Sequence, residues 1–223
     1  MDILKKNSIY AAIAIILIVV SALTAVKILS GIVEEHYERV KTVCLDAGHG
    51  ADDVGATSTG GARLEKDDNL RLTLKVRDKL EKRGIKVVLT REDDSDITLK
   101  ERCKLANKEN CDFFVSLHRN SSVSGTGFEA WIAKQPKANE EETAEKLVEA
   151  LSKNSGLPNR GVKRGYRNSS GNNYYVNSNT NMPSILLEVG FITNEDDNKS
   201  FDANLEKNAE SIADIIYDSI YIK

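Results

Sequence analysis

The sequence predicts an α/β fold: a mainly parallel open sheet with helices on both faces, preceded by one N-terminal transmembrane helix. Two observations predict the sheet. Short apolar runs alternate with segments whose apolar residues recur every three or four positions, and several of these runs end in polar residues that suit the rim of a parallel sheet. The third observation, an uncharged stretch near the N-terminus, predicts the transmembrane helix.

The stretch from Ser8 to Val26 has no charged residue, and a helix needs about 20 apolar residues to cross a bilayer. It is long for a signal-peptide core, and no clean cleavage site follows it, so we expect an uncleaved signal anchor rather than a cleaved signal. Lys5 and Lys6 precede the span, which places the N-terminus inside and the remainder outside. The chain is therefore predicted to comprise a cytoplasmic tail (1–7), a transmembrane anchor (8–26), a linker (27–41) and one globular domain (42–223).

The first half of the domain alternates strand and helix. The apolar run at 42–46 predicts a strand, and a glycine-rich polar loop follows it. Acidic residues around Asp67 suit a helix N-terminus and Gly84 suits its end, while the apolar residues between them recur four apart, at Leu72, Val76 and Leu80. The elements predicted next are a strand at 85–89, a helix at 98–107 and a strand at 113–117.

The second half is less regular. Weak alternation predicts an additional strand at 127–132, and a polar helix with an apolar stripe is predicted at 139–153. Residues 168–181 are rich in Asn, Ser and Gly, so we expect a long rim loop with a short strand at Tyr174–Val176. A strand at 184–189 and a closing helix at 205–217 complete the domain.

Charge and cysteine content exclude some classes of protein. The net charge is −3, with basic and acidic residues mixed along the chain, so no nucleic-acid-binding surface is expected. Cys44 and Cys103 are expected to be packed thiols, although the sequence leaves a Cys103–Cys111 bridge open. We expect a monomer.

Two histidines and a glutamate fall at or just past predicted strands: His49, His118 and Glu188. Because ligands bind at the carboxyl ends of parallel strands, two imidazoles and a carboxylate are expected on one rim. Catalytic zinc commonly has three protein ligands from His, Asp and Glu, with one position open for water. The pattern therefore indicates a mononuclear zinc hydrolase.

The third zinc ligand must be a carboxylate. Glu65 is the best candidate because it follows the polar loop after His49 and precedes a helix start. Asp46, Asp52 and Asp53 are alternatives, and Asp46 is so near His49 in the sequence that we expect it to orient a ligand instead.

Glu188 lies in an otherwise apolar strand, where an ionised carboxylate is costly unless it is paired or functional. It could carry a proton from water to a leaving amine, and the pattern alone is equally compatible with a structural carboxylate. Glu129 is a weaker alternative for this role and is expected to face solvent. The chain has no G-x-S-x-G nucleophile motif, so catalysis by a serine is less favoured.

Several short motifs occur in order along the domain: Leu45-Asp46-Ala47-Gly48-His49-Gly50, Glu65 with Asn69-Leu70, Leu89-Thr90-Arg91, Arg102 with Ala106-Asn107, Ser116-Leu117-His118-Arg119-Asn120, Arg160-Gly161-Val162-Lys163 and Leu187-Glu188-Val189-Gly190-Phe191-Ile192-Thr193-Asn194. This ordered set resembles the zinc-dependent N-acetylmuramoyl-L-alanine amidases of the bacterial cell wall, over nearly the whole region from Thr42 onward. The resemblance implies one zinc ion per chain on His49, Glu65 and His118, Glu188 as the catalytic acid/base, and peptidoglycan as the substrate. The reaction implied is hydrolysis of the amide between N-acetylmuramic acid and the L-alanine of the stem peptide.

Two departures from the family pattern stand out. Arg119 occupies a position where the family usually has a small or apolar residue, which suggests an altered substrate preference. The segment 134–158 is short and lacks the inhibitory insertion of Gram-negative relatives. The membrane anchor is expected to hold the enzyme outside the cytoplasm, facing the wall. Two other functions stay open: a catalytically inactive wall-binding relative, and a zinc peptidase that cuts within stem peptides.

Overall fold

The computed structural model describes residues 2–36, 39–167 and 172–221, and the chain divides into two compact units, Met1–Val40 and Lys41–Lys223. The first unit contains helix α1 (Asp2–His36), which continues through most of the stretch predicted as a linker. In the part of the chain that the structure describes, no helix is long and apolar enough to cross a membrane. The transmembrane helix predicted over residues 8–26 is therefore not confirmed.

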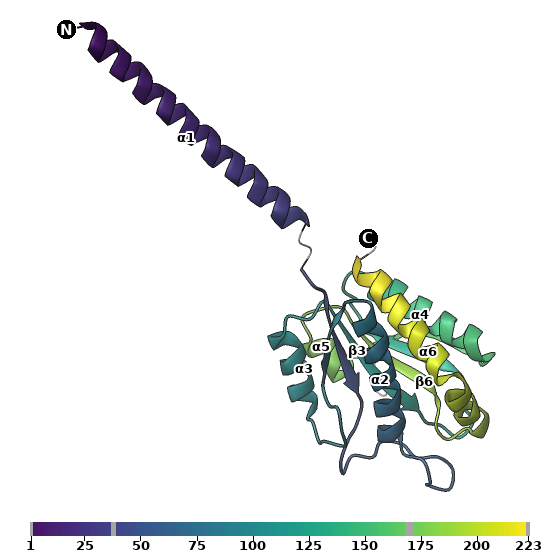
Figure 1. The fold of residues 1–223 in the computed structure, drawn as a ribbon. Helices are drawn as coiled ribbons and strands as arrows, with labels where there is room; N and C mark the ends of the chain where they lie inside the picture. The colour runs from purple at the N-terminus through teal and green to yellow at the C-terminus, as the bar shows by residue number, and fades with distance from the viewer. Residues whose placement is uncertain (1, 37–38, 168–171, 222–223) are drawn as a thin grey trace. The chain divides into compact units, whose positions relative to one another are not determined.

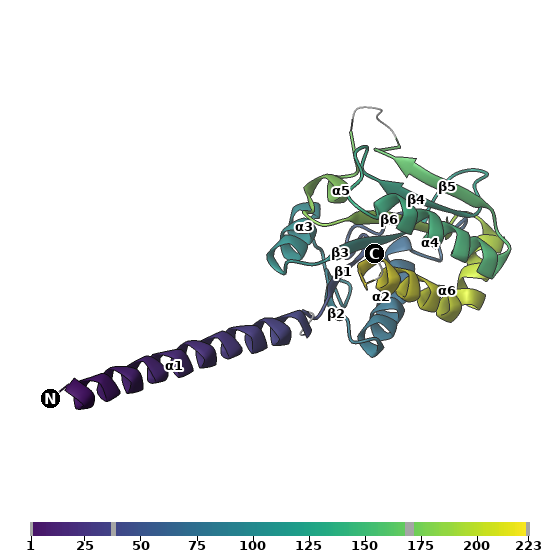
Figure 2. The ribbon, with the colours of Figure 1, turned by 90° about the horizontal axis from the view of Figure 1, so that it is seen from above.

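The second unit is built on a six-stranded sheet, whose strands β3 and β6 are labelled in Figure 1, and the strand order β2-β1-β3-β6-β4-β5 can be followed in Figure 2. The central strands β1, β3 and β6 are buried along nearly their whole length, which explains why they are continuous apolar runs in the sequence. The strands are β1 (Thr42–Ala47), β2 (Lys86–Leu89), β3 (Phe113–Asn120), β4 (Phe128–Ile132), β5 (Asn159–Arg164) and β6 (Ser184–Phe191).

The sheet is mixed, because β4 runs antiparallel to β6 while the other described pairings are parallel. The loop from Asn120 to Phe128 is too short for a crossover, which typically needs about a dozen residues or more, so the chain can only turn back. Strand β5 was not predicted. It is an edge strand whose residues are exposed or partly exposed and include Arg160, Lys163 and Arg164, so it lacks the apolar run that identified the others.

Helices cover both faces of the sheet, as predicted (Figure 2). On one face α2 (Glu65–Lys82) and α4 (Glu140–Ser155) both pack against α6 (Glu195–Tyr221), and on the other α3 (Leu99–Lys108) packs against α5 (Tyr175–Asn179). The short strand predicted at Tyr174–Val176 is wrong, because these residues enter α5; residues 168–171 of the same predicted loop lie outside the described residues.

Two boundaries differ from the prediction for local reasons. Helix α6 begins at Glu195 rather than near Leu205, because the Asn194 side chain accepts hydrogen bonds from the backbone of Asp196 and Asp197 and so caps the helix. Helix α2 begins at Glu65, two residues before the predicted start, so Glu65 is its first residue.

Each face of the sheet has its own apolar core. The larger core joins the sheet to α2, α4 and α6, and the smaller one joins it to α3 and α5. Cys44, Cys103 and Cys111 lie in the smaller core as free, buried thiols, so the Cys103–Cys111 bridge is not formed.

Candidate active site

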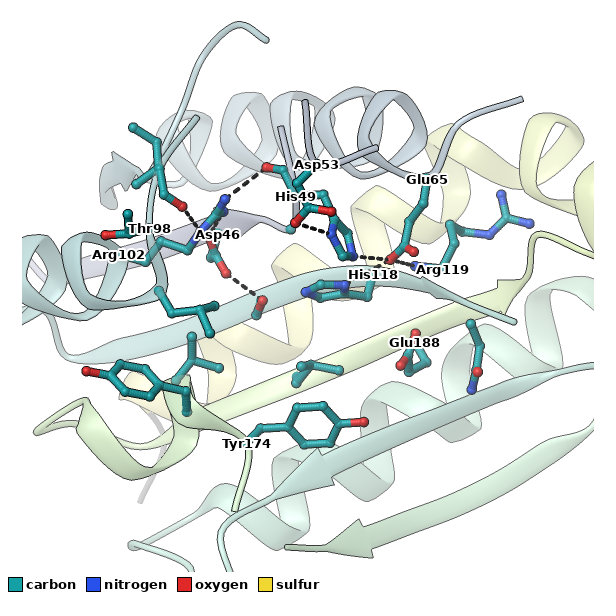
Figure 3. Close-up of a pocket in the computed structure, with 18 of the residues that line it drawn as sticks. Asp46, His49, Asp53, Glu65, Thr98, Arg102, His118, Arg119, Tyr174 and Glu188 are labelled. Atoms are coloured by element: carbon teal, nitrogen blue, oxygen red, sulfur yellow. Dashed lines mark hydrogen bonds and ion pairs between the residues drawn. The ribbon is translucent and has the colours of Figure 1, made fainter. Parts of the chain in front are cut away.

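A pocket of about 480 Å³ lies at the carboxyl ends of β1, β3 and β6 (Figure 3). His49 follows β1, Glu65 begins α2, and His118 and Glu188 lie in β3 and β6. All four residues line this pocket, so the convergence expected from the strand ends is present.

Three of these residues form a compact set of potential metal ligands. One donor atom from each of His49, Glu65 and His118 lies within 4.8 Å of the others. Oε1 of Glu65 lies 3.2 Å from Nε2 of His49 and 2.9 Å from Nδ1 of His118. Two imidazole nitrogens and one carboxylate oxygen are a usual donor set for catalytic zinc.

A tight turn holds the His49 ring in place. The backbone of His49 has φ 64°, in the left-handed region that side chains other than glycine rarely adopt. Reciprocal backbone hydrogen bonds of 2.9 and 3.0 Å between Gly50 and Asp53 close the turn behind it. The turn brings a carboxylate oxygen of Asp53 to 2.8 Å from Nδ1 of His49, which leaves Nε2 facing Glu65. This arrangement fixes the tautomer of a ligating histidine.

Backbone and side-chain donors hold the Glu65 carboxylate. Oε2 accepts a 2.8 Å hydrogen bond from the backbone of Ala56, and Oε1 accepts one of 3.1 Å from the backbone of Arg119. Burial opposes its charge, but hydrogen bonds with His118 and His49 hold the pKa of Glu65 far below its usual value. Glu65 is therefore ionised at neutral pH, as a metal ligand must be.

Two glycines leave room for the ligand rings. A Cβ atom at Gly48 would lie 2.2 Å from Cε1 of His118, and one at Gly55 would lie 2.7 Å from both Glu65 and His49. No real Cβ atom tolerates such contacts, so larger residues at these positions would displace the ligands.

The charges of the cluster suit a bound cation. Burial opposes protonation of His49, yet its hydrogen bonds with Glu65 and Asp53 raise its pKa to about 9. The second proton of the His49 ring supplies a positive charge beside the Glu65 carboxylate, and a bound metal ion would supply that charge instead. The residues present therefore fit a divalent metal ion, with the nitrogen and oxygen donors that zinc prefers.

Asp46 does not orient a metal ligand through its side chain, contrary to the prediction. It is buried and accepts hydrogen bonds from Thr90 (2.7 Å), Ser116 (2.6 Å) and Arg102 (2.6 Å). Arg102 in turn donates to the backbone oxygen of His49 at 2.9 Å, so Asp46 supports the loop and Asp53 contacts the ring. Asp52, the other alternative ligand, is exposed and outside the cluster.

Glu188 lies beside the ligand cluster without belonging to it. Its side chain is almost fully buried, and Oε2 has no hydrogen-bond partner in the described structure. Burial raises the pKa of Glu188 to about 7, against the opposing positive charges of His118 and Arg167. A carboxyl group that titrates near neutral pH, with one oxygen unpaired, can take up and release a proton during a reaction.

Glu129 is buried rather than facing solvent, which corrects the prediction. It accepts hydrogen bonds from Arg160 (2.9 Å), Arg167 (2.9 Å), Asn120 (2.9 Å) and Trp131 (3.1 Å). Burial opposes its charge, but Arg160 and its other partners hold the pKa of Glu129 below the usual value, so Glu129 stays ionised and is a poor alternative to Glu188. Sequence reasoning missed this network because its members come from separate strands and a loop.

Arg119 also differs from expectation. Arg119 is among the residues that line the pocket, but its guanidinium is fully buried against Asp68 and lies 4.4 Å over the ring of Phe201. It also donates a 2.6 Å hydrogen bond to Asn198. The side chain therefore joins β3 to α2 and α6 and does not face a substrate.

The sequence and the fold of the chain match those of known cell-wall amidases. The model of the N-acetylmuramoyl-L-alanine amidase family matches residues 43–221. The chain is 36% identical over 160 residues to N-acetylmuramoyl-L-alanine amidase LytC of Bacillus subtilis (70% of this chain, 30% of LytC). It is 32% identical over 173 residues to the germination-specific N-acetylmuramoyl-L-alanine amidase of the same organism (69% and 68%). A crystal structure of N-acetylmuramoyl-L-alanine amidase from Clostridium difficile 630 superposes with a TM-score of 0.75 at 32% identity, covering 83% of this chain and all of that one.

Proposed function

Because the chain belongs to the N-acetylmuramoyl-L-alanine amidase family, we propose that one zinc ion on His49, Glu65 and His118, with Glu188 as proton carrier, performs its reaction. The enzyme is an N-acetylmuramoyl-L-alanine amidase, which hydrolyses the amide between N-acetylmuramic acid and L-alanine in peptidoglycan. The observation that carries the proposal is the meeting of three ligand atoms within 4.8 Å beside a buried carboxylate.

The ligand side chains are held in orientations that suit metal binding. Zinc bound there would act as a Lewis acid on the substrate carbonyl and would make water a better nucleophile near neutral pH. His49 is oriented by Asp53, and Glu65 by the backbone of Ala56 and Arg119. These contacts set the direction of the donor atoms before any ion binds, which lowers the cost of forming the site.

Glu188 moves the proton. As water adds to the amide carbon, Glu188 accepts one of its protons on a carboxylate oxygen. When the carbon–nitrogen bond breaks, the same proton passes to the nitrogen, and the L-alanine amine leaves with Glu188 ionised again. The unpaired Oε2 and the pKa near 7 support this assignment, because the group must exist in both states at neutral pH.

The products of peptidoglycan digestion test the reaction. Purified enzyme should release intact stem peptides with a free L-alanine amine, seen by mass spectrometry of the soluble fraction. Shortened peptides would instead indicate a zinc peptidase. Absence of any product with zinc-loaded protein would indicate an inactive wall-binding relative.

We also propose that the enzyme works as a monomer at the outer face of the cell membrane. All four site residues come from one chain, so a single copy carries the complete set. The uncharged stretch from Ser8 to Val26, preceded by Lys5 and Lys6, supports a signal anchor with the domain outside. Membrane fractionation and protease treatment of spheroplasts that carry a C-terminal reporter test this placement. A reporter in the soluble fraction, or one protected from external protease, would contradict it.

A further inference from the structure

Arg160 and Arg167 both form ion pairs with the buried carboxylate of Glu129, which lies on the strand next to Glu188. Glu129 is the antiparallel register partner of Glu188 across β4 and β6. Nε of Arg160 lies 2.9 Å from Oε2 of Glu129, and Nη2 of Arg167 lies 2.9 Å from Oε1. The Glu129 carboxylate thus holds both guanidinium groups by ion pairs.

Only one of these two arginines reaches the pocket in the described structure. Arg167 lines it with Glu188, and their closest nitrogen and oxygen atoms are 3.7 Å apart. Arg160 lies instead over the ring of Phe191, 5.0 Å from its centroid, and does not line the pocket. Arg167 is therefore the arginine of this pair that a bound substrate could contact.

Arg167 is held in position and still has donors to spare. Its Nη2 donates to Glu129 and, at 2.8 Å, to Oδ1 of Asn120. Its Nε and Nη1 make no hydrogen bond within the described chain, and its side chain is 37% exposed. The other arginines of the lining, Arg102 and Arg119, are instead buried in their ion pairs with Asp46 and Asp68. A fixed guanidinium with free donors is a good partner for a carboxylate.

The strand order indicates which part of a bound substrate would lie beside Arg167. The ligand His118, the proton carrier Glu188 and the anchor Glu129 lie on β3, β6 and β4, which are neighbours in that order. In the proposed mechanism Glu188 protonates the leaving amine, so the chain attached to that amine lies on the Glu188 side. We propose that Arg167 binds a carboxylate of the stem peptide just beyond L-alanine and thereby favours substrates with an acidic second residue. This inference rests on the proposed amidase function.

A pair of matched substrates tests the inference. Two soluble N-acetylmuramoyl peptides are compared, identical except that the second residue has a free carboxylate or a carboxamide. With the zinc-loaded full-length chain, kcat/KM should be about tenfold or more higher for the carboxylate, mainly through KM, because an ionic hydrogen bond is lost in the amide. Arg167→Gln should abolish this preference, and Arg167→Lys should keep part of it because the charge remains.

Arg160→Gln is the matched control, because it removes the other partner of Glu129 without changing the pocket lining. It should keep the carboxylate preference. Equal rates of wild-type enzyme on both substrates would overturn the inference. So would an Arg167→Gln variant that slows both substrates alike and shifts the pH profile, since Arg167 would then act through Glu188. Cleavage of neither substrate by wild-type enzyme would instead refute the proposed amidase function.

Discussion

His118 and Glu188 are register partners on the adjacent parallel strands β3 and β6. The pairing places a metal-ligand candidate and a buried carboxylate at neighbouring positions of one rim. Backbone hydrogen bonds of the sheet, rather than flexible loops, set the spacing between them. Changes to either side chain should therefore alter chemistry while the strands keep their places.

Removal of the ligands should remove the metal. Purified wild-type protein should contain about one zinc per chain, and a chelator should abolish activity that added zinc restores. His49→Ala, His118→Ala and Glu65→Ala should each lose zinc, measured by elemental analysis, because each supplies one of the clustered donor atoms. Full zinc content and activity in Glu65→Ala would show that the third ligand is another carboxylate.

Asp53 should tune zinc affinity through His49, since its carboxylate lies 2.8 Å from Nδ1 of that ring. Asp53→Asn should weaken zinc binding on the order of tenfold or more, measured by competition with a chromogenic chelator. Asp52→Asn removes the same charge from the neighbouring exposed position and is the control. Equal zinc affinity in the two variants would mean that the contact with His49 has no effect on the metal.

Arg119 should matter for stability and not for substrate choice. Arg119→Met leaves part of the buried charge of Asp68 uncompensated, so the free energy of unfolding should fall by about 3–5 kcal/mol. Arg71 contacts the same aspartate from a 48% exposed position, and Arg71→Gln should cost about 1 kcal/mol or less. Denaturant unfolding measures both. A stable Arg119→Met protein with altered substrate preference would restore the interpretation suggested by the sequence.

The titration of Glu188 should be visible in the stability of metal-free protein. Its pKa is raised to about 7, so the folded state binds this proton more tightly than the unfolded state does. Binding of this proton by the folded state adds to the free energy of unfolding. The addition is complete below the pKa that Glu188 has in the unfolded chain, and it is lost as pH rises through about 7. Glu188→Gln should therefore lose less stability than wild type between about pH 5 and pH 8, by roughly 3 kcal/mol at most. Parallel pH dependences in the two proteins would contradict the raised pKa.

Local sequence patterns predicted the parts of the fold that depend on burial. Strands β1, β3 and β6 are buried on both faces, so their apolar runs marked both the sheet and the rim where His49, His118 and Glu188 lie. The edge strand β5 has no such run, and the reversal of β4 depends on the length of a loop. For these reasons β5 was missed and the antiparallel direction of β4 was not predicted.

Buried ion pairs between distant positions were beyond sequence reasoning. Glu129 was expected to face solvent because its partners Arg160 and Arg167 are more than thirty positions away. Arg119 was expected to alter substrate preference, because nothing local in the sequence pointed to its ion pair with Asp68. Nearness in sequence also favoured Asp46 over Asp53 as the partner of His49, although the Asp46 carboxylate is held by Arg102 and Ser116 instead.

Turnover of Glu188→Gln tests the central claim most directly, because glutamine keeps the shape of the side chain but cannot accept the proton. Zinc content, melting temperature and peptidoglycan hydrolysis should be measured on one preparation. We expect a folded, zinc-loaded variant that binds peptidoglycan and hydrolyses it at least about a hundredfold more slowly than wild type. A structural role predicts a lower melting temperature with nearly normal activity in the folded fraction. Stable, zinc-loaded and fully active Glu188→Gln protein would contradict the assignment of Glu188 as the proton carrier.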